Sequence, residues 1–331
     1  MKTFIIAEFG MLHDGSFGNA CKMVETAKEC GADAVKFQTH IPEAETLPNA
    51  PMPPFFKGEP RWEYFKRTGF TLEQWDKLKK YCDEVGIEFM SSPFSVEAVE
   101  LLEKVGMKRY KIPSGEVTNL PFLERAAKTG KPVLLSSGMS SWQELDEAVA
   151  TLRKAGTKDL TVFQCTSIYP TPSEKVGLNV MLDMKKRYEC HIGLSDQSLT
   201  NNACLAAVTL GANVIEKHIT LTKRCYGSDA KHSIEPEEFT ELVRGVREIE
   251  KMLENPVDKN DLSAFLEMKR VFEKSVVTLV DVPAGAVLTD KMLGIRKPGS
   301  GIAPRRYKDL IGRKAKREIK AGQTLLDSDV Q

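Results

Sequence analysis

Short apolar runs alternate with amphipathic stretches eight times between residues 3 and 254, and this alternation constrains the fold more than any other feature. The amphipathic stretches carry apolar residues at three- and four-residue spacing, which is typical of helices. The short runs between them read as strands buried on both faces. The predicted strands are Thr3–Glu8, Ala34–Gln38, Ile87–Ser91, Arg109–Ile112, Val133–Ser136, Thr161–Cys165, His191–Leu194 and Asn213–Lys217. Eight successive strand–helix units predict a (β/α)8 TIM barrel, an α/β fold.

An open, doubly wound sheet is the alternative arrangement of such units. Its glycine-rich G-x-G-x-x-G turn is missing after the first predicted strand, where Glu8-Phe9-Gly10 stands instead. One connection, residues 40–67, is unusually long and rich in proline. Because it leaves the end of the second strand, we expect it to lie over the barrel mouth as a functional lid or a disordered insert.

A polar segment near residue 258 separates the barrel from a tail of different character. We predict a barrel domain at 1–257, a linker at 258–272 and a small β-rich domain at 273–331. The tail contains two similar phrases, VDVPAGAVLT and REIKAGQTLL, each expected to turn at Ala-Gly. A domain of roughly 60 residues has only a marginal core, so we expect it to lean on another surface.

The composition argues against membrane, disulfide-stabilised and nucleic-acid-binding proteins. No apolar run approaches the roughly 20 residues needed to span a bilayer, and we expect a cytoplasmic protein. The seven cysteines are scattered and form no CxxC pair. Residues 273–331 carry 12 Lys and Arg against 7 Asp and Glu, but Tyr307 is their only aromatic residue. A base-stacking surface for nucleic acid is therefore not expected, and the basic face is equally well explained as solvated surface.

All eight predicted strands end in polar or ionisable side chains, and the carboxyl ends of strands form the active-site face of such barrels. Lys36 and Lys111 stand at two of these ends, with Ser92, Ser114 and Ser195 at others. Lysine supplies a point charge and hydroxyls supply directed hydrogen bonds, which suits a small doubly anionic ligand. The absence of a Walker loop argues against a nucleotide.

His218 ends the eighth predicted strand and shares its face with Glu216. If Glu8, Gln197 and Asp229 lie close to it, the site is rich in oxygen with a single imidazole. Such a site suits Mn²⁺ or Mg²⁺ better than zinc. A buried structural histidine is the alternative that these residues leave open.

Several phrases, in order along nearly the whole chain, resemble the sialic acid synthase family, which makes N-acetylneuraminate, legionaminate, pseudaminate and related acids. They are IAEFG (6–10), AVKFQT (34–39), YKIPSGE (110–116), KPVLLSSGM (131–139), CTSIYPTP (165–172), GLSD (193–196) and EKH (216–218). In the tail, KPGSGI (297–302) is similar to the antifreeze-like SAF domain at this family's C-terminus.

The resemblance implies a barrel that joins phosphoenolpyruvate to an open-chain N-acylhexosamine of the ManNAc type, giving a nine-carbon α-keto acid and phosphate. It also implies a divalent metal and a domain-swapped homodimer. By motif, the implied catalytic residues are Glu8, Lys36 and Lys111; phosphoenolpyruvate is held by Lys36, Ser92, Lys111, Ser114, Ser167 and Ser195; the sugar is faced by Gln38, Phe94, Glu116, Tyr169, Asp229, Arg296 and Lys297; and the metal is bound by His218 and Gln197.

The chain departs from the family pattern at three positions. Gln197 stands where the family usually has histidine, Ser167 where it commonly has asparagine, and Leu12 where asparagine often precedes the first histidine. These changes affect the expected identity of the metal and of the sugar substrate more than the expected type of reaction. The alternatives are therefore a diacetamido-trideoxyhexose substrate, as in legionaminate or pseudaminate synthases, and a barrel that binds an acidic sugar without turnover.

Overall fold

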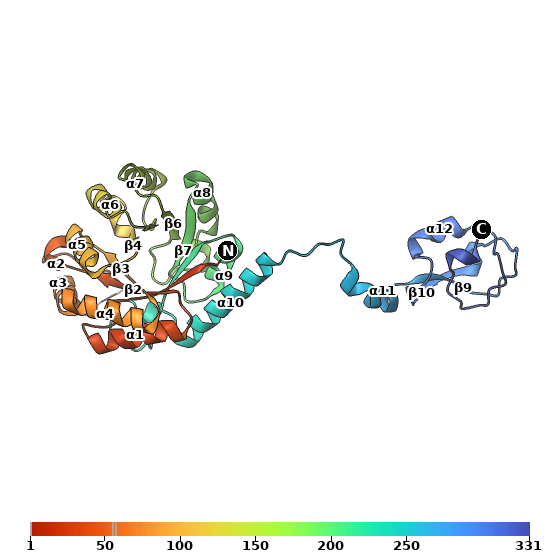
Figure 1. Ribbon diagram of the computed structural model, residues 1–331, viewed down its shortest axis with the longest axis horizontal. Helices are drawn as coiled ribbons and strands as arrows, with labels where there is room; N and C mark the ends of the chain where they lie inside the picture. The colour runs from red at the N-terminus through yellow and green to blue at the C-terminus, as the bar shows by residue number, and fades with distance from the viewer. Residues whose placement is uncertain (1, 55, 57) are drawn as a thin grey trace. The chain divides into compact units, whose positions relative to one another are not determined.

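The computed structural model describes residues 2–54, 56 and 58–331 (Figure 1). The chain divides into two compact units, Met1–Asn255 and Pro256–Gln331. The first unit holds all eight alternating strand–helix repeats, and the second holds the tail.

The first unit is built on eight parallel strands in the order β3-β2-β1-β8-β7-β6-β5-β4. They are β1 (Phe4–Gly10), β2 (Ala34–Thr39), β3 (Glu88–Pro93), β4 (Tyr110–Ile112), β5 (Val133–Ser136), β6 (Leu160–Cys165), β7 (His191–Asp196) and β8 (Val214–His218). The two ends of this order, β3 and β4, lie in contact and close the sheet. The predicted (β/α)8 barrel is thus confirmed.

One long helix follows each strand and covers the outside of the barrel. These helices are α1 (Phe17–Glu29), α4 (Leu72–Val85), α5 (Val96–Val105), α6 (Leu120–Ala127), α7 (Trp142–Lys154), α8 (Leu178–Tyr188), α9 (Asn202–Thr209) and α10 (Pro236–Glu254). Their ends follow from local chemistry. Thr71 and Gln74 form a capping box at the start of α4, and Gly86 ends the helix in the left-handed conformation.

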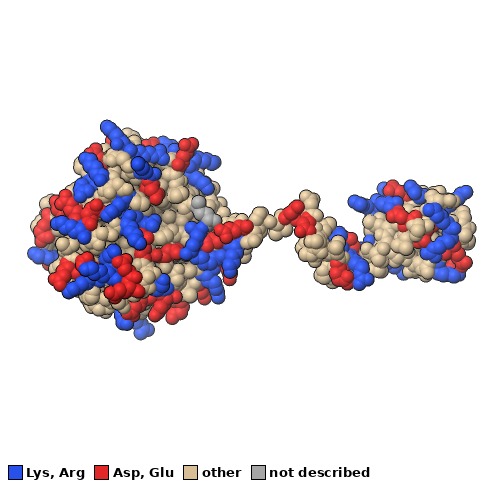
Figure 2. Space-filling model, in the orientation of Figure 1, with Lys and Arg blue, Asp and Glu red and all other residues tan. Residues whose placement is uncertain are grey.

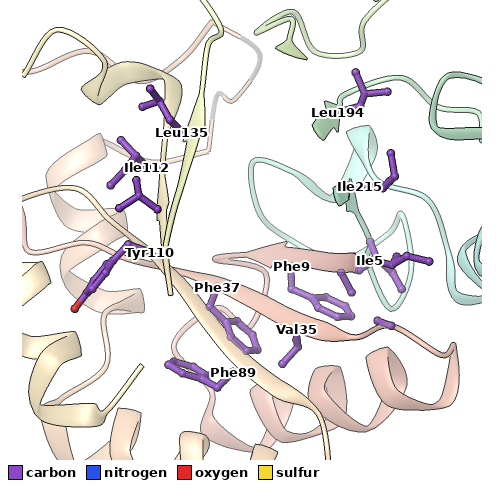
Figure 3. Close-up of a cluster of buried hydrophobic side chains, with 14 of the residues drawn as sticks. Ile5, Phe9, Val35, Phe37, Phe89, Tyr110, Ile112, Leu135, Leu194 and Ile215 are labelled. Atoms are coloured by element: carbon purple, nitrogen blue, oxygen red, sulfur yellow. The ribbon is translucent and has the colours of Figure 1, made fainter. Parts of the chain in front are cut away.

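The main core lies between the outer faces of the strands and these helices. Figure 3 shows Phe37 of β2 and Phe89 of β3 on the side of the barrel wall that faces the helices. The ring of Phe37 is 6.3 Å from the ring of Trp75, a fully buried residue of α4. A smaller apolar cluster, which we call the plug, fills the barrel interior with Ile6, Ala34, Met90, Leu134, Phe163 and Val214.

The long connection after β2 contains two helices that the sequence did not lead us to expect, α2 (Pro42–Glu45) and α3 (Arg61–Thr68). α3 begins directly after Pro60 and buries Tyr64 and Phe65. The prediction missed α2 and α3 because a four-residue and an eight-residue helix carry too little periodicity among prolines to be recognised. Phe55 and Lys57 in this connection lie outside the described residues.

Several strands run past their predicted ends. β1 continues to Gly10, β7 to Asp196 and β8 to His218. Polar residues near these positions suggested that each strand ends earlier. In the structure these side chains face the barrel interior or the neighbouring strand instead of solvent, and the ends of all three strands are paired in the sheet.

The second unit is a small β-rich fold with its own core. Strands β9 (Ser275–Thr278) and β10 (Leu293–Arg296) pair in antiparallel fashion, and α12 (Tyr307–Leu310) follows. Its buried residues include Val276, Leu288 and Leu325. Both Ala-Gly phrases turn as expected, with φ of 79° at Gly285 and 80° at Gly322. Part of the predicted linker is helical, as α11 (Leu266–Phe272).

The barrel face shown in Figure 2 carries acidic and basic side chains interspersed with one another. None of the helices in the described part of the chain is both long and apolar enough to cross a membrane. The charges on this face do not single out a binding surface, and the interior of the barrel is more informative.

Candidate active site

The polar interior of the barrel follows from the two-residue period of its strands. Two positions after the plug residues Ile6, Ala34, Met90 and Val214 come Glu8, Lys36, Ser92 and Glu216, which therefore point to the same interior. They face a cavity of about 70 Å³ above the plug. The cavity is lined by Glu8, Lys36, Gln38, Ser92, Phe94, Lys111, Pro113, Ser114, Ser136, Cys165, Tyr169, Ser195, Gln197, Glu216 and His218.

Glu216 is the centre of the charged network. Its Oε1 accepts hydrogen bonds from Lys111 Nζ at 3.0 Å and Ser195 Oγ at 3.1 Å, and Lys36 Nζ lies 3.8 Å away. Burial works to raise the pKa of Glu216, but Lys111 and Lys36 overcome it and lower the pKa to about 2. Glu216 is thus an anion that holds two lysines in place.

Glu8 is the second carboxyl group in the cavity and behaves in the opposite way. Burial raises the pKa of Glu8 and Glu216 raises it further, although Lys36 opposes both. Lys36 Nζ lies 2.8 Å from Glu8 Oε2, and Gln38 Nε2 donates to Oε1 at 2.9 Å. Two neighbouring carboxyl groups whose pKa values are pushed apart are typical of an acid–base site.

Both lysines also donate to serine hydroxyls on the next strand. Lys111 Nζ donates to Ser136 Oγ at 2.8 Å, and it lies 4.9 Å from the centre of the Phe163 ring in the plug. Lys36 Nζ donates to Ser92 Oγ at 3.1 Å. The two cations are thus fixed around the cavity and could share a small dianion there.

Gly138, just beyond β5, brings two further serines together. Its N–H donates to Ser114 Oγ at 3.1 Å. A Cβ atom at this position would lie 2.3 Å from Ser167 Oγ and 2.6 Å from Ser114 Oγ, so any side chain here would have to displace these hydroxyls. Ser167 itself lines an adjoining cavity of about 450 Å³, which shares Cys165 with the site.

Three buried atoms around the cavity lack a hydrogen-bond partner within the described residues: Gln197 Oε1, Glu216 Oε2 and His218 Nδ1. Glu8 Oε2 is paired with Lys36 at 2.8 Å. Gln197 Nε2 donates to Ser195 Oγ at 3.3 Å, which leaves its oxygen available. Unpaired buried polar atoms are costly, and they are typical of a site that binds a ligand.

A divalent metal was expected at His218 and Gln197. The available imidazole nitrogen and amide oxygen fit Mn²⁺ or Mg²⁺, which accept few protein ligands when water or substrate completes the shell. Among the residues that the structure describes, no group of three or more His, Cys, Asp or Glu could hold a metal ion by itself. The protein therefore offers part of a coordination shell at this place.

The residues expected to face the sugar are only partly brought together. Gln38, Phe94 and Tyr169 line the cavity. Asp229 is buried close by, since a Cβ atom at Gly10 would lie 2.6 Å from its Oδ2 and 3.2 Å from Gln38 Nε2. Glu116 does not line the cavity. It is half-buried and accepts a hydrogen bond from Asn119 at 2.8 Å.

The last two expected sugar residues, Arg296 and Lys297, lie in the second unit. Both are exposed; Arg296 ends β10, and Lys297 Nζ lies 4.9 Å from the centre of the Phe272 ring. Neither belongs to the cavity lining within the barrel.

Sequence reasoning assigned no role to Ser136, Cys165 and Glu216, although all three line the cavity. Each stands at or next to the end of a predicted strand, two residues after an interior apolar residue. That two-residue phase is the signal that could have found them. Glu216 was noted only for sharing the face of His218, and its contact with Lys111 spans 105 residues of sequence.

Comparison with known protein families gives two matches. Residues 23–258 match the NeuB family, and residues 273–331 match the SAF domain. The chain is 35% identical over 333 residues to the N,N'-diacetyllegionaminic acid synthase of Campylobacter jejuni, covering 98% of this chain and 99% of that protein. It is 36% identical over 331 residues to the N-acetylneuraminate-9-phosphate synthase of Homo sapiens, covering 98% of this chain and 91% of that protein.

A solved structure is similar as well. The N-acetylneuraminic acid (sialic acid) synthetase of Leptospira borgpetersenii, in complex with citrate, superposes with a TM-score of 0.71 at 31% identity. The similarity covers 81% of this chain and 92% of that one.

Proposed function

Since the chain belongs to the NeuB family, we propose that it is a nonulosonic acid synthase that condenses phosphoenolpyruvate with an open-chain N-acylhexosamine of the ManNAc type. The products are a nine-carbon α-keto sugar acid and phosphate. The observation that carries the proposal is the cavity in which two buried lysines and two carboxyl groups with opposite pKa shifts face unpaired polar atoms.

In this proposal the two lysines hold the anionic substrate. Lys36 and Lys111 supply positive charge for the carboxylate and phosphate of phosphoenolpyruvate. The hydroxyls of Ser114 and Ser167, which lie around Gly138, add directed hydrogen bonds at the edge of the cavity. The hydroxyls of Ser92 and Ser195 serve the same purpose deeper in the site.

The reaction forms one carbon–carbon bond and exchanges the C2–O bond to phosphate for a bond from C2 to the oxygen of water. C3 of the enol attacks the aldehyde carbon, and positive charge develops at C2. Water adds to C2, and the tetrahedral intermediate then expels phosphate as its C2–O bond breaks. Glu8 exchanges a proton with the reacting groups, a role that fits the upward shift of its pKa by burial. Glu216 stays ionised and keeps both lysines in position.

A divalent metal belongs to the proposal as a cofactor. His218 and Gln197 would hold it through the nitrogen and oxygen that have no other partner among the described residues. When bound, Mn²⁺ or Mg²⁺ would polarise the aldehyde oxygen of the sugar. The amide of Gln197 is a weaker ligand than imidazole for most transition metals, which favours a hard cation here.

The sugar could also be a diacetamido-trideoxyhexose, within the same reaction class. The relatives described above are named for N-acetylneuraminate and for diacetyllegionaminate at nearly equal identity. The names of these relatives also favour an enzyme over a barrel that only binds an acidic sugar.

We further propose a cytoplasmic, domain-swapped homodimer. Its support lies in α11 and the residue before it, where Phe265, Leu266, Met268 and Phe272 are 52–65% exposed within the single chain. A second copy would cover this apolar segment and could bring Arg296 and Lys297 to the partner's cavity. Light scattering after size exclusion should give twice the chain mass of 36.9 kDa, and a monomer would contradict the proposal.

The deciding experiment measures phosphate release from phosphoenolpyruvate with a panel of N-acylated hexoses. Release should depend on the sugar, stop with EDTA and return with Mn²⁺ or Mg²⁺. If no sugar supports release, the binding-only barrel is the better description. Full release after exhaustive chelation would remove the metal from the proposal without affecting the rest.

A further inference from the structure

A hydrogen-bonded chain of side chains leads from Glu8 out of the cavity to the connection that follows β2. Gln38 Nε2 donates to Glu8 Oε1 at 2.9 Å, and Gln38 Oε1 lies 3.2 Å from His40 Nε2. The other ring nitrogen, His40 Nδ1, lies 2.7 Å from Glu45 Oε1. Glu45 Oε2 accepts the backbone N–H of Ile41 at 3.3 Å, which anchors the far end of the chain.

The imidazole in the middle of this chain is held between two aromatic rings. The centre of the His40 ring lies 3.6 Å from that of Phe65 on α3, with 13° between the planes. On its other side the Phe94 ring lies 4.0 Å away at 21°. The side chain of His40 is only 2% exposed. The ring therefore has little freedom to turn, and its two nitrogens point in fixed directions.

This geometry dictates which groups donate. Lys36 lies beside Glu8, and Glu8 accepts the N–H of Gln38. The amide oxygen of Gln38 can only accept, so in this arrangement His40 Nε2 carries a hydrogen. The hydrogen of the Nδ1 contact is on Nδ1 or on Glu45 Oε1. The terminal torsion of a glutamine is broad, and nothing in Gln38 itself chooses which end of the amide faces Glu8. A turned amide would set its oxygen against the Glu8 carboxylate.

We propose that His40, fixed by Glu45, is a positioning residue that keeps the N–H of the Gln38 amide directed at Glu8. His40 acts through Gln38 and does not itself face the reacting atoms. Gln38 then serves Glu8 as well as the sugar. The order of the connection after β2 is thereby coupled to the acid–base group, because α2 carries Glu45 and α3 carries Phe65.

The kinetic test rests on the proposed function and uses two replacements of His40. His40→Phe keeps the ring stack and removes both nitrogens, whereas His40→Gln keeps an N–H donor near the Nε2 position. His40→Phe should lower kcat on the order of 10–100-fold, the usual effect of losing a partner that orients a site residue. The KM for phosphoenolpyruvate should stay within about twofold, and His40→Gln should restore a large part of kcat.

A double-mutant cycle separates positioning from loss of structure. In a Gln38→Leu background, His40→Phe should change kcat by no more than about twofold, because its effect passes through Gln38. Full additivity of the two changes would overturn the proposal. His13→Phe is the matched control, since His13 is also buried against aromatic rings and has no hydrogen bond to Glu8 or Gln38 among the described contacts. It should leave kcat unchanged.

A measurement that needs no turnover keeps this test separate from the proposed function. In protein labelled with ¹⁵N at histidine, the signals of His40 are identified by their loss in His40→Gln. His40 Nε2 should resonate as a protonated nitrogen, and its signal should move in Gln38→Leu. A ring protonated at Nδ1 alone would overturn the proposal, even if the wild type releases phosphate. If the wild type shows no turnover with any sugar, the proposed function fails, and the ¹⁵N signals alone decide the role of His40.

Discussion

The inner and outer walls of the barrel each bury a charged cluster, and the two clusters are built differently. Inside, Lys36 and Lys111 meet Glu8 and Glu216, and one carboxyl oxygen of Glu216 has no hydrogen-bond partner in the described structure. Outside, Lys217 donates to Asp196 at 2.6 Å and to two backbone oxygens.

The outer cluster is complete in itself. Asp196 also accepts hydrogen bonds from Ser198 N at 2.9 Å and Ser198 Oγ at 3.0 Å, and Cys204 Sγ lies 3.3 Å away. Neither Lys217 nor Asp196 is among the unpaired buried groups of the described residues. Burial of charge therefore does not distinguish a binding site from a structural ion pair. Buried polar atoms that lack a hydrogen-bond partner and lie beside a cavity do distinguish a binding site.

The largest expected effect is at Lys111. Lys111→Ala should lower kcat on the order of 10³-fold or more, because it removes one of two cations proposed to hold the anionic substrate. Glu216 keeps Lys36 and Ser195, so the protein should remain folded. Phosphate release and thermal unfolding are the measurements. Retained activity would show that the inner cluster is structural, like the outer one.

Lys217→Met should show the reverse pattern. Leaving Asp196 buried without its cation should lower the free energy of unfolding by about 3–5 kcal/mol. The control is Lys223→Met, which breaks an ion pair with Glu238 that is about 40% exposed and should cost less than about 1 kcal/mol. Denaturant unfolding measures both. Equal stability of the two variants would mean that the ion pair of Lys217 and Asp196 does not stabilise the fold.

A variant of His13 can show whether a buried polar atom without a hydrogen-bond partner indicates a functional site even where no cavity lies beside it. Its Nε2 has no partner among the described residues, but the rings of Phe37, Phe70 and Trp75 surround it. Burial lowers the pKa of His13 to about 4. The unfolded chain then binds the proton more readily, so stability from this group is full above about pH 6.5 and falls as the pH drops toward 4.

The expected loss is on the order of 3 kcal/mol between pH 7 and pH 4. His13→Phe should remove this part of the pH dependence while catalysis continues. Unfolding followed by fluorescence at several pH values measures the effect. If the free energy of unfolding depends on pH in the variant as it does in the wild type, burial of neutral His13 does not contribute to stability in this way.

The smallest expected effect is at Gly138. Gly138→Ala should raise the KM for phosphoenolpyruvate about 10-fold, because the added Cβ displaces the hydroxyls of Ser114 and Ser167. Gly115→Ala is the control, since a Cβ there meets nothing within 4 Å. If both variants bind phosphoenolpyruvate as the wild type does, these two serines are not part of the anion site.

The alternation of strands and helices was sufficient to predict the barrel, because eight regular repeats leave few other arrangements. Most of the residues that line the cavity, from Glu8 to His218, could also be predicted, because the carboxyl ends of the strands form one face of such a barrel. The contacts between distant strands could not be predicted. Nothing local shows that Glu216 joins Lys36 and Lys111, or that Lys217, one residue later, faces the opposite wall. The helices α2 and α3 were missed because tertiary packing of Phe65, more than local periodicity, decides their order.

The plug of Ile6, Met90, Leu134 and Phe163 has a kinetic consequence under the proposed function. It closes the barrel interior below the cavity, so the substrates should enter from the side of the carboxyl ends of the strands. The deeper lysines receive their anion before the sugar can be seated above it, so the substrates should bind in a compulsory order. Departure should then run in reverse, with the sugar acid leaving before phosphate, and phosphate should compete with phosphoenolpyruvate for the empty cavity.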